Sequence, residues 1–203
     1  MDLPSPEKSG PNEAIADVPQ QPSRGYSCDG LFHRPNAHFG VLYCFFVIGH
    51  DRRKILHFNV TRNPDALWIV QQLREAWAYK QPHRLLLFDR DAKFGANVVS
   101  AVRDMGSEPI RTAFRSPWQN GVAERWVGSC RRDLLDHVII LNERHLKRLM
   151  SAYLHYYHED RTHLGLSKDT PAGRLTEIRG ARAGQIQSLS RLGGLHHRYA
   201  VAA

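Results

Sequence analysis

The sequence lacks any run of the eighteen or so apolar residues that a membrane span needs, and it has few cysteines. Its first residues also lack the basic and then apolar pattern of a secretory signal, so we predict a cytoplasmic protein. The three cysteines, Cys28, Cys44 and Cys130, are far apart and have no metal-ligand spacing. We therefore assign them no chemistry and expect buried thiols.

Acidic residues are also in the minority. The chain has 28 Lys and Arg against 20 Asp and Glu, a formal charge of +8, and a pI near 9.7. Such an excess favours a polyanionic partner, because each neutralised phosphate releases condensed counterions. A basic enzyme without a nucleic-acid partner fits the charge alone equally well.

The length of 203 residues suits one sizeable domain with tails. Residues 1–25 hold five of the eleven prolines and have no periodic apolar pattern, so we predict a disordered leader. A single core is expected over 26–175. Residues 176–203 are rich in Gly, Arg and Ala, which indicates a flexible C-terminal tail.

Apolar periodicity predicts an α/β layout with a mixed sheet. An apolar run and an alternating run on either side of the polar turn HDRRK predict a hairpin, and a helix follows with Asn63 as its cap and Pro64 in its first turn. Gly106 is expected to stop a second helix. The expected strands are 40–48, 54–60, 84–88 and 108–114, and the later helices begin at Val122 and Asn142.

Two carboxylates stand out because of their positions. In LLLFDRDAKFG, Asp89 follows a buried strand directly, and functional sites of α/β sheets collect at such strand ends. Glu124 lies about 140° from the middle of the buried stripe of its helix and so faces away from the core. A turn residue and a solvated helical face are the ordinary explanations. In a basic domain the pair also suggests a hard divalent cation, and the two ions typical of DNA phosphoryl transfer need a third carboxylate.

Four segments resemble one family: VLYCFFVIGHDRRKILHFNV, LLLFDRDAKFG, RSPWQNGVAERWVGSCRRDLLDHVI and YYHEDRTHLGLSKDTP. The chain is similar over about 31–175 to the integrase core of retroviral integrases and bacterial insertion-sequence transposases, the DDE superfamily. The resemblance implies a ribonuclease H-like mixed sheet flanked by helices. It also implies two Mg²⁺ or Mn²⁺ ions, DNA 3′-end hydrolysis and strand transfer, and a homo-oligomer on DNA in the bacterial cytoplasm, without a membrane or small-molecule substrate.

The family's metal-binding triad is two aspartates and a glutamate. The 34 residues between Asp89 and Glu124 match its spacing, so the resemblance implies that these are the second and third members. A gap-free alignment brings Gly30 to the position of the first, with Asp29 one residue early. Strand alternation would then point Asp29 away from the metal unless a bulge at Gly30 re-aims it. Asp51, in the HDRRK turn, is a weaker substitute.

Basic and polar residues around Glu124 are candidates for a DNA-facing surface on which arginines contact phosphate and a polar loop orders the substrate strand. A solubilising face followed by a helix start is the alternative. We read Asp91 as a loop residue or an acceptor near the metal. The candidate DNA-binding residues are Lys93, Arg115, Trp118, Gln119, Asn120, Arg125, Arg131 and Arg132.

Three functions compete at this point. The first is a transposase or integrase-like enzyme with Asp89, Glu124 and Asp29 as ligands. The second is a catalytically impaired remnant that binds DNA or oligomerises, suggested by Gly30 and by the lack of the helix-turn-helix region that usually precedes the family's core. The third is a metal-dependent nuclease that cleaves DNA without joining it.

Overall fold

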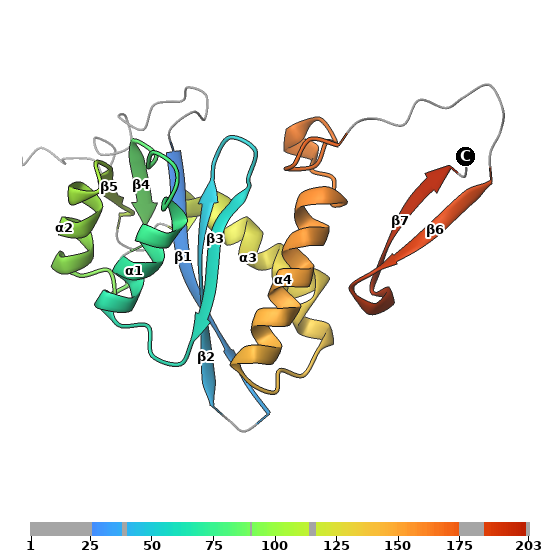
Figure 1. Ribbon diagram of the computed structural model, residues 1–203, viewed down its shortest axis with the longest axis horizontal. Helices are drawn as coiled ribbons and strands as arrows, with labels where there is room; N and C mark the ends of the chain where they lie inside the picture. The colour runs from blue at the N-terminus through green and yellow to red at the C-terminus, as the bar shows by residue number, and fades with distance from the viewer. Residues whose placement is uncertain (1–25, 38–39, 90, 114–116, 175–184, 202–203) are drawn as a thin grey trace, which may run out of the picture.

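The computed structural model describes residues 26–37, 40–89, 91–113, 117–174 and 185–201. Its body is a five-stranded mixed sheet with the strand order β3-β2-β1-β4-β5 (Figure 1). The first three strands are antiparallel, and β4 and β5 run parallel to β1. The sheet strands are β1 (Tyr26–Pro35), β2 (Val41–Gly49), β3 (Ile55–Thr61), β4 (Leu85–Phe88) and β5 (Glu108–Arg111).

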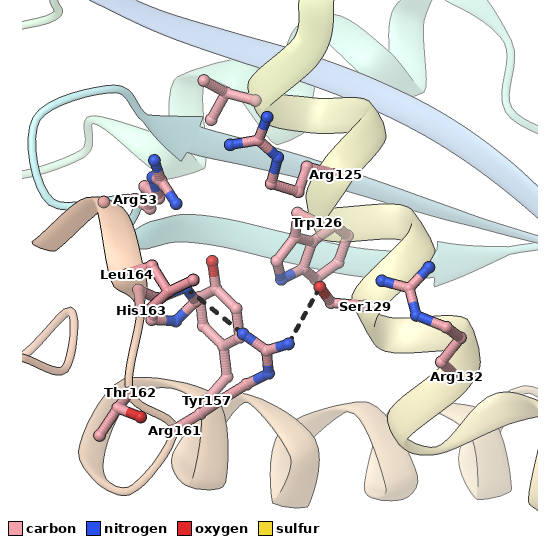
Figure 2. A pocket seen from close by; sticks show the side chains of 12 residues that line it. Arg53, Arg125, Trp126, Ser129, Arg132, Tyr157, Arg161, Thr162, His163 and Leu164 are labelled. Carbon is pink, nitrogen blue, oxygen red and sulfur yellow. Dashed lines mark hydrogen bonds between the residues drawn. The ribbon is translucent and has the colours of Figure 1, made fainter. Parts of the chain in front are cut away.

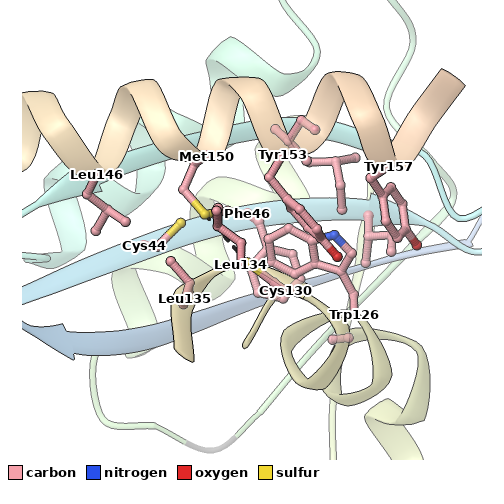
Figure 3. Close-up of a cluster of buried hydrophobic side chains, with 14 of the residues drawn as sticks. Cys44, Phe46, Trp126, Cys130, Leu134, Leu135, Leu146, Met150, Tyr153 and Tyr157 are labelled. Carbon is pink, nitrogen blue, oxygen red and sulfur yellow. Dashed lines mark hydrogen bonds between the residues drawn. The ribbon is translucent and has the colours of Figure 1, made fainter. Parts of the chain in front are cut away.

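Helices cover both faces of this sheet, as Figure 1 shows. On one face, Phe45 and Val47 of β2 pack in a cluster with apolar side chains of α1 and α2. On the other, Phe46 packs with α3 and α4, and its ring lies 4.2 Å from that of Trp126 (Figure 3). The mixed α/β sheet expected from the sequence is thus confirmed. The helices are α1 (Ala66–Ala76), α2 (Ala96–Asp104), α3 (Gly121–Asp133) and α4 (Glu143–Glu159).

The ends of the helices test the capping predictions. Asn142, where the last helix was expected to begin, is the N-cap of α4, because its Oδ1 accepts from the backbone N–H of His145 at 2.9 Å. Gly106 follows α2 with a φ of 86°, a conformation that favours glycine. The cap predicted for α1 is wrong: Asp65, not Asn63, accepts from the backbone N–H of Trp68 at 2.7 Å. An aspartate next to the helix outcompetes the more distant asparagine.

The C-terminal segment differs from the flexible tail predicted over 176–203. Strands β6 (Ile186–Arg191) and β7 (His196–Val201) form an antiparallel hairpin beside α4 (Figure 1). Arg191 and Arg198 both pair with the carboxylate of Asp160 at the end of α4. The ring of His196 also stacks on Tyr156 with centroids 4.7 Å apart. The strands are largely exposed, so they lack the apolar pattern from which a strand is predicted in a sequence.

Three further expectations concern the cysteines, membrane-spanning helices and the first residues of the chain. Cys44 and Cys130 are buried free thiols, as expected. The part of the chain with described structure contains no helix that is long and apolar enough to cross a membrane. The leader predicted over 1–25 lies outside the described residues.

Candidate metal centre and nucleic-acid interface

Asp29 lies in the middle of β1, in a continuous ladder with β2. It pairs with Val47, whereas Gly30 pairs with Phe46. Paired residues of neighbouring strands point to the same face of a sheet, so Asp29 faces the α1 and α2 side and Gly30 faces the other core. The ladder from Ser27 to Pro35 has no register shift, so it contains no bulge at Gly30 that would re-aim Asp29.

The parallel ladder with β4 brings Asp29 to the level of Phe88, one residue before Asp89. Cys28 pairs with Leu87, so Asp29 comes next at the carboxyl end of β4, which Asp89 directly follows. The carboxyl group of Asp29 is completely buried, and this burial raises its pKa well above the usual range, with a further rise from the negative charge of Asp89. The two aspartates therefore share one site, and their like charges oppose each other.

Both carboxylate oxygens of Asp29 are buried without a hydrogen-bond partner among the described residues. A buried charge without a partner is very costly, so the group must hold either a proton or a cation. Asp89 is exposed, and its Oδ1 accepts from the backbone N–H of Asp91 at 2.9 Å. The site thus has one buried acceptor that lacks a partner and one acceptor open to solvent.

Helix α3 approaches the same strand with its first residues. The side-chain Nδ2 of Asn120 donates to the backbone carbonyl of Asp29 at 3.2 Å, which ties the start of α3 to β1. The Oδ1 of Asn120 is a further buried oxygen without a partner in the described part of the chain. Glu124 lies one turn later on the same side of α3 and is exposed, as expected from its angle.

The donor set fits a hard cation in part. Asp29 and Asn120 supply buried oxygen atoms that lack hydrogen bonds, and Asp89 adds a carboxylate, the ligand chemistry that Mg²⁺ favours. Among the described residues, however, no three His, Cys, Asp or Glu side chains lie close enough together to hold a metal ion. The structure thus brings Asp29 and Asp89 together but leaves Glu124 outside a metal-binding group. Asp51, the weaker candidate, lies exposed in the turn between β2 and β3.

The residues proposed to face DNA do not form one surface. Trp118 is 68% exposed, and the Oε1 of Gln119 accepts from the backbone N–H of Ala113 at 2.6 Å. The Nζ of Lys93 pairs with Asp91 at 3.2 Å. These residues lie near the carboxylates, in or next to the segments that follow β4 and β5.

The arginines of α3 divide between two sides of the helix. Arg131 lies 3.9 Å from the carboxylate of Asp136. Arg125 and Arg132 instead line a pocket that also contains Arg53 and Arg161. Sequence reasoning singled out neither of these last two for binding, and Arg115 lies outside the described residues. The only signals for the missed pair were the arginine run of HDRRK and the position of Arg161 in EDRTHLGL, which spacing could not bring together.

Comparison with known proteins identifies the type of core. The model of the family "integrase core domain" matches residues 105–171. No curated protein sequence matches the chain significantly. The family match contains the helix with Glu124 and ends at Pro171, at the close of the EDRTHLGL region.

Solved structures extend the match to the fold. The chain is similar to a chain in the structure of the simian T-cell lymphotropic virus intasome in complex with the PP2A regulatory subunit B56 gamma. The two chains are 12% identical with a TM-score of 0.62, and the match covers 88% of this chain and 66% of that one. The HTLV-2 integrase catalytic core domain in complex with magnesium is 9% identical with a TM-score of 0.59, and the match covers 74% of this chain and 95% of that one. The catalytic domain of the Mos1 mariner transposase is 14% identical with a TM-score of 0.56, and the match covers 65% of this chain and 70% of that one.

These findings confirm the resemblance seen in the sequence. Residues 105–171 match the model of the integrase core domain family. The described chain has the ribonuclease H-like fold of integrase and transposase catalytic cores.

Proposed function

We propose that this chain is the catalytic core of a DNA transposase or integrase that cuts DNA 3′ ends and joins them to target DNA. The observation that carries the proposal is the buried carboxylate of Asp29, without a hydrogen-bond partner and next to Asp89 at the carboxyl end of β4. The match of residues 105–171 to the integrase core family supports it. Action on DNA in the bacterial cytoplasm, as a homo-oligomer, is part of the same proposal.

In this proposal Asp29, Asp89 and Glu124 hold Mg²⁺ or Mn²⁺. When bound, such ions activate the attacking oxygen and neutralise charge on the leaving oxygen. Asn120 fixes the backbone of Asp29 relative to α3, and the N–H of Asp91 orients the carboxylate of Asp89. Water is the nucleophile in end hydrolysis and a DNA 3′-hydroxyl in strand transfer, without a covalent protein intermediate.

Glu124 lies on α3, which covers the face of the sheet opposite to the one that Asp29 points to. It completes the proposed ligand set only if the Asp29 carboxylate is also re-aimed. The exposure of Glu124 leaves its carboxylate free to change rotamer without disturbing the core.

The impaired remnant is the second candidate, and one observation still favours it: the described residues contain no ready group of three ligands. Its original reason also stands in part, because Gly30 rather than Asp29 points to the face that α3 covers, although Asp29 lies near Asp89.

The test is strand transfer by the purified chain on a pre-cut DNA end with Mn²⁺. Wild type should give joined products, and Asp89→Asn and Glu124→Gln should each lower the rate by about a thousandfold or more, since a bound metal contributes several kcal/mol of transition-state stabilisation. Glu159→Gln, an exposed glutamate at the far end of α4, is the matched control and should retain the wild-type rate.

The products separate the three candidate functions. Joined DNA supports the proposal. Cleavage without joining would identify a nuclease instead. Wild-type protein that binds DNA but yields neither product would identify the remnant.

A further inference from the structure

A second polar site lies on the side of α3 that faces α4, away from Glu124. It is a cavity of about 390 Å³ between α3, the turn after β2 and the segment that follows α4 (Figure 2). At about 100° per residue, Trp126 lies about 160° from Glu124 around α3, and Arg125 and Arg132 lie about 100° and 80° from it. The lining of the cavity includes no residue of the proposed metal centre. The cavity is therefore separate from the proposed metal centre.

The cavity is strongly basic. Four of its lining residues are arginines, and none is acidic. Arg161 forms an ion pair with Asp133 at 2.7 Å. Within the described residues, the guanidinium groups of Arg53, Arg125 and Arg132 have no such partner. Three uncompensated cations around one space repel each other, and an anion between them would relieve that repulsion.

Two residues that line the cavity, Trp126 and His163, have ring N–H groups that are buried. The Nη1 of Arg161 lies 3.4 Å from the Nδ1 of His163, which makes Nδ1 the acceptor and places the ring proton on Nε2. That Nε2 and the indole Nε1 of Trp126 are both buried without a partner in the part of the chain that the structure describes. His163 is only 7% exposed. Both nitrogen atoms lie behind the cavity surface, so the arginines are the charged groups that a ligand in the cavity would meet.

The neutral state of His163 is consistent with the positive charges around the cavity. Burial, together with the charges of Arg161 and Arg53, lowers its pKa to about 4. The ring is therefore neutral near pH 7 and keeps one N–H to donate. The carboxylate of Asp133 opposes this shift but is already bound to Arg161 and to the hydroxyl of Tyr153.

The surrounding fold holds the arginines in place. Arg53 has a φ of 58° in the turn between β2 and β3, a left-handed conformation that non-glycine residues seldom adopt. Gly165 leaves room for it, because a Cβ there would lie 2.4 Å from the Nη2 of Arg53. Arg161 is held between Asp133 and the hydroxyl of Ser129 (Figure 2). Uncommon backbone geometry that aims a charged side chain at a cavity is typical of binding sites.

We propose that the cavity between α3 and the EDRTHLGL segment is a binding site for a phosphate group, with Arg53, Arg125 and Arg132 as its charged contacts. Phosphate has several strong acceptor oxygens and matches the forked geometry of guanidinium groups. The inference does not depend on the proposed function, because none of its residues is a carboxylate of the metal centre.

The first test is thermal unfolding of the full chain with inorganic phosphate replacing chloride at constant ionic strength. Phosphate should raise the Tm of the wild type in a saturable way. The variant Arg125→Gln/Arg132→Gln should weaken phosphate binding about tenfold or more, as expected when charge-assisted hydrogen bonds are lost. Arg148→Gln, an exposed arginine of α4 outside the cavity, should bind like wild type.

Two further variants separate binding from folding. Arg53→Asn removes the charge but suits the left-handed turn, and Gly165→Ala displaces the Arg53 side chain without changing any charge. Both should fold and both should bind phosphate more weakly. The proposal is overturned if phosphate stabilises the wild type no more than chloride, or if Arg148→Gln loses as much phosphate binding as the cavity variants.

The source of the phosphate is decided by DNA binding at several salt concentrations. If the cavity takes a DNA phosphate, Arg125→Gln/Arg132→Gln should reduce the slope of log affinity against log salt by about 0.9 per lost contact. If the slope is unchanged while phosphate binding is lost, the ligand is a free or small-molecule phosphate. Asp89→Asn should keep the phosphate response, which distinguishes a failure here from a failure of the metal centre.

Discussion

Asp29→Asn is expected to abolish strand transfer and, in the same protein, to raise the Tm measured without metal. The loss of activity should reach about a thousandfold or more, because a metal ligand is removed. The gain in stability has the opposite sign because the wild-type carboxylate is buried, unpartnered and close to Asp89. An uncharged amide avoids that repulsion. We expect a rise of at least roughly 2–4 °C, the effect of about 1 kcal/mol in a chain of this size.

The pH dependence of the metal-free protein follows from the same carboxyl group. Its pKa is raised in the folded state, so the folded protein keeps a proton that the unfolded chain releases. The stability due to this group is therefore present at low pH and is lost as the pH rises through the folded-state pKa. In the proposed metal centre Mg²⁺ would take the place of that proton, so the Tm increase that Mg²⁺ produces should grow with pH in the wild type and disappear in Asp29→Asn.

Thermal unfolding in EDTA and in Mg²⁺ over a range of pH measures both effects. Asp104→Asn is the control, because this aspartate is exposed at the end of α2. A lower Tm for Asp29→Asn in EDTA, or normal strand transfer by this variant, would contradict the placement of Asp29 in the metal centre.

Gly30→Asp is expected to unfold the protein rather than to restore a missing ligand. A Cβ at this position would lie 2.5 Å from the Cζ of Phe46, far inside contact distance. Phe46 is fully buried and packs against Trp126, so its ring has no free space to enter. Overpacking alone costs about 1–3 kcal/mol. A carboxylate forced into this apolar cluster adds a further desolvation penalty.

The two contributions can be separated with smaller changes. Gly30→Ala should lose about 1–3 kcal/mol of unfolding free energy in urea, from overpacking alone. Gly30→Asp should lose more and show no strand transfer. Phe46→Leu in the Gly30→Ala background should recover part of the loss, which a double-mutant cycle detects. Gly121→Ala is the control, because nothing lies within 4 Å of its added Cβ. A stable and active Gly30→Asp protein would show that the register of β1 is different.

Much of the central sheet could be predicted because its strands are buried and therefore apolar. The run of 41–48 and the alternation after Lys54 indicated β2 and β3, and the helical spacing after Val122 placed Glu124 on the exposed side of α3. The first strand was harder. Gly30 interrupts its apolar pattern, and an alignment without gaps shifted the first aspartate by one residue. Because strand side chains alternate, that single residue decides whether the aspartate points to the α1 and α2 face of the sheet or to the face that α3 covers.

The features that the sequence did not predict depend on contacts between distant segments. Arg53 and Arg161 are 108 positions apart, and only the packing of α4 against the sheet brings them to one cavity. The C-terminal hairpin is similar: its strands are exposed and polar, and it is attached to the body through Asp160. Ion pairs between distant residues leave no periodic trace in a sequence.

The attachment of this hairpin also bears on how the protein should be produced. The side chain of Asp160 is 3% exposed, and its ion-pair partners Arg191 and Arg198 lie beyond Pro171, where the family match ends. A fragment trimmed to that match would leave a buried carboxylate without a cation. It would also remove His196, which bonds to the carbonyl of Asp133, the residue that holds Arg161 at the cavity. An expression fragment should therefore extend through Val201.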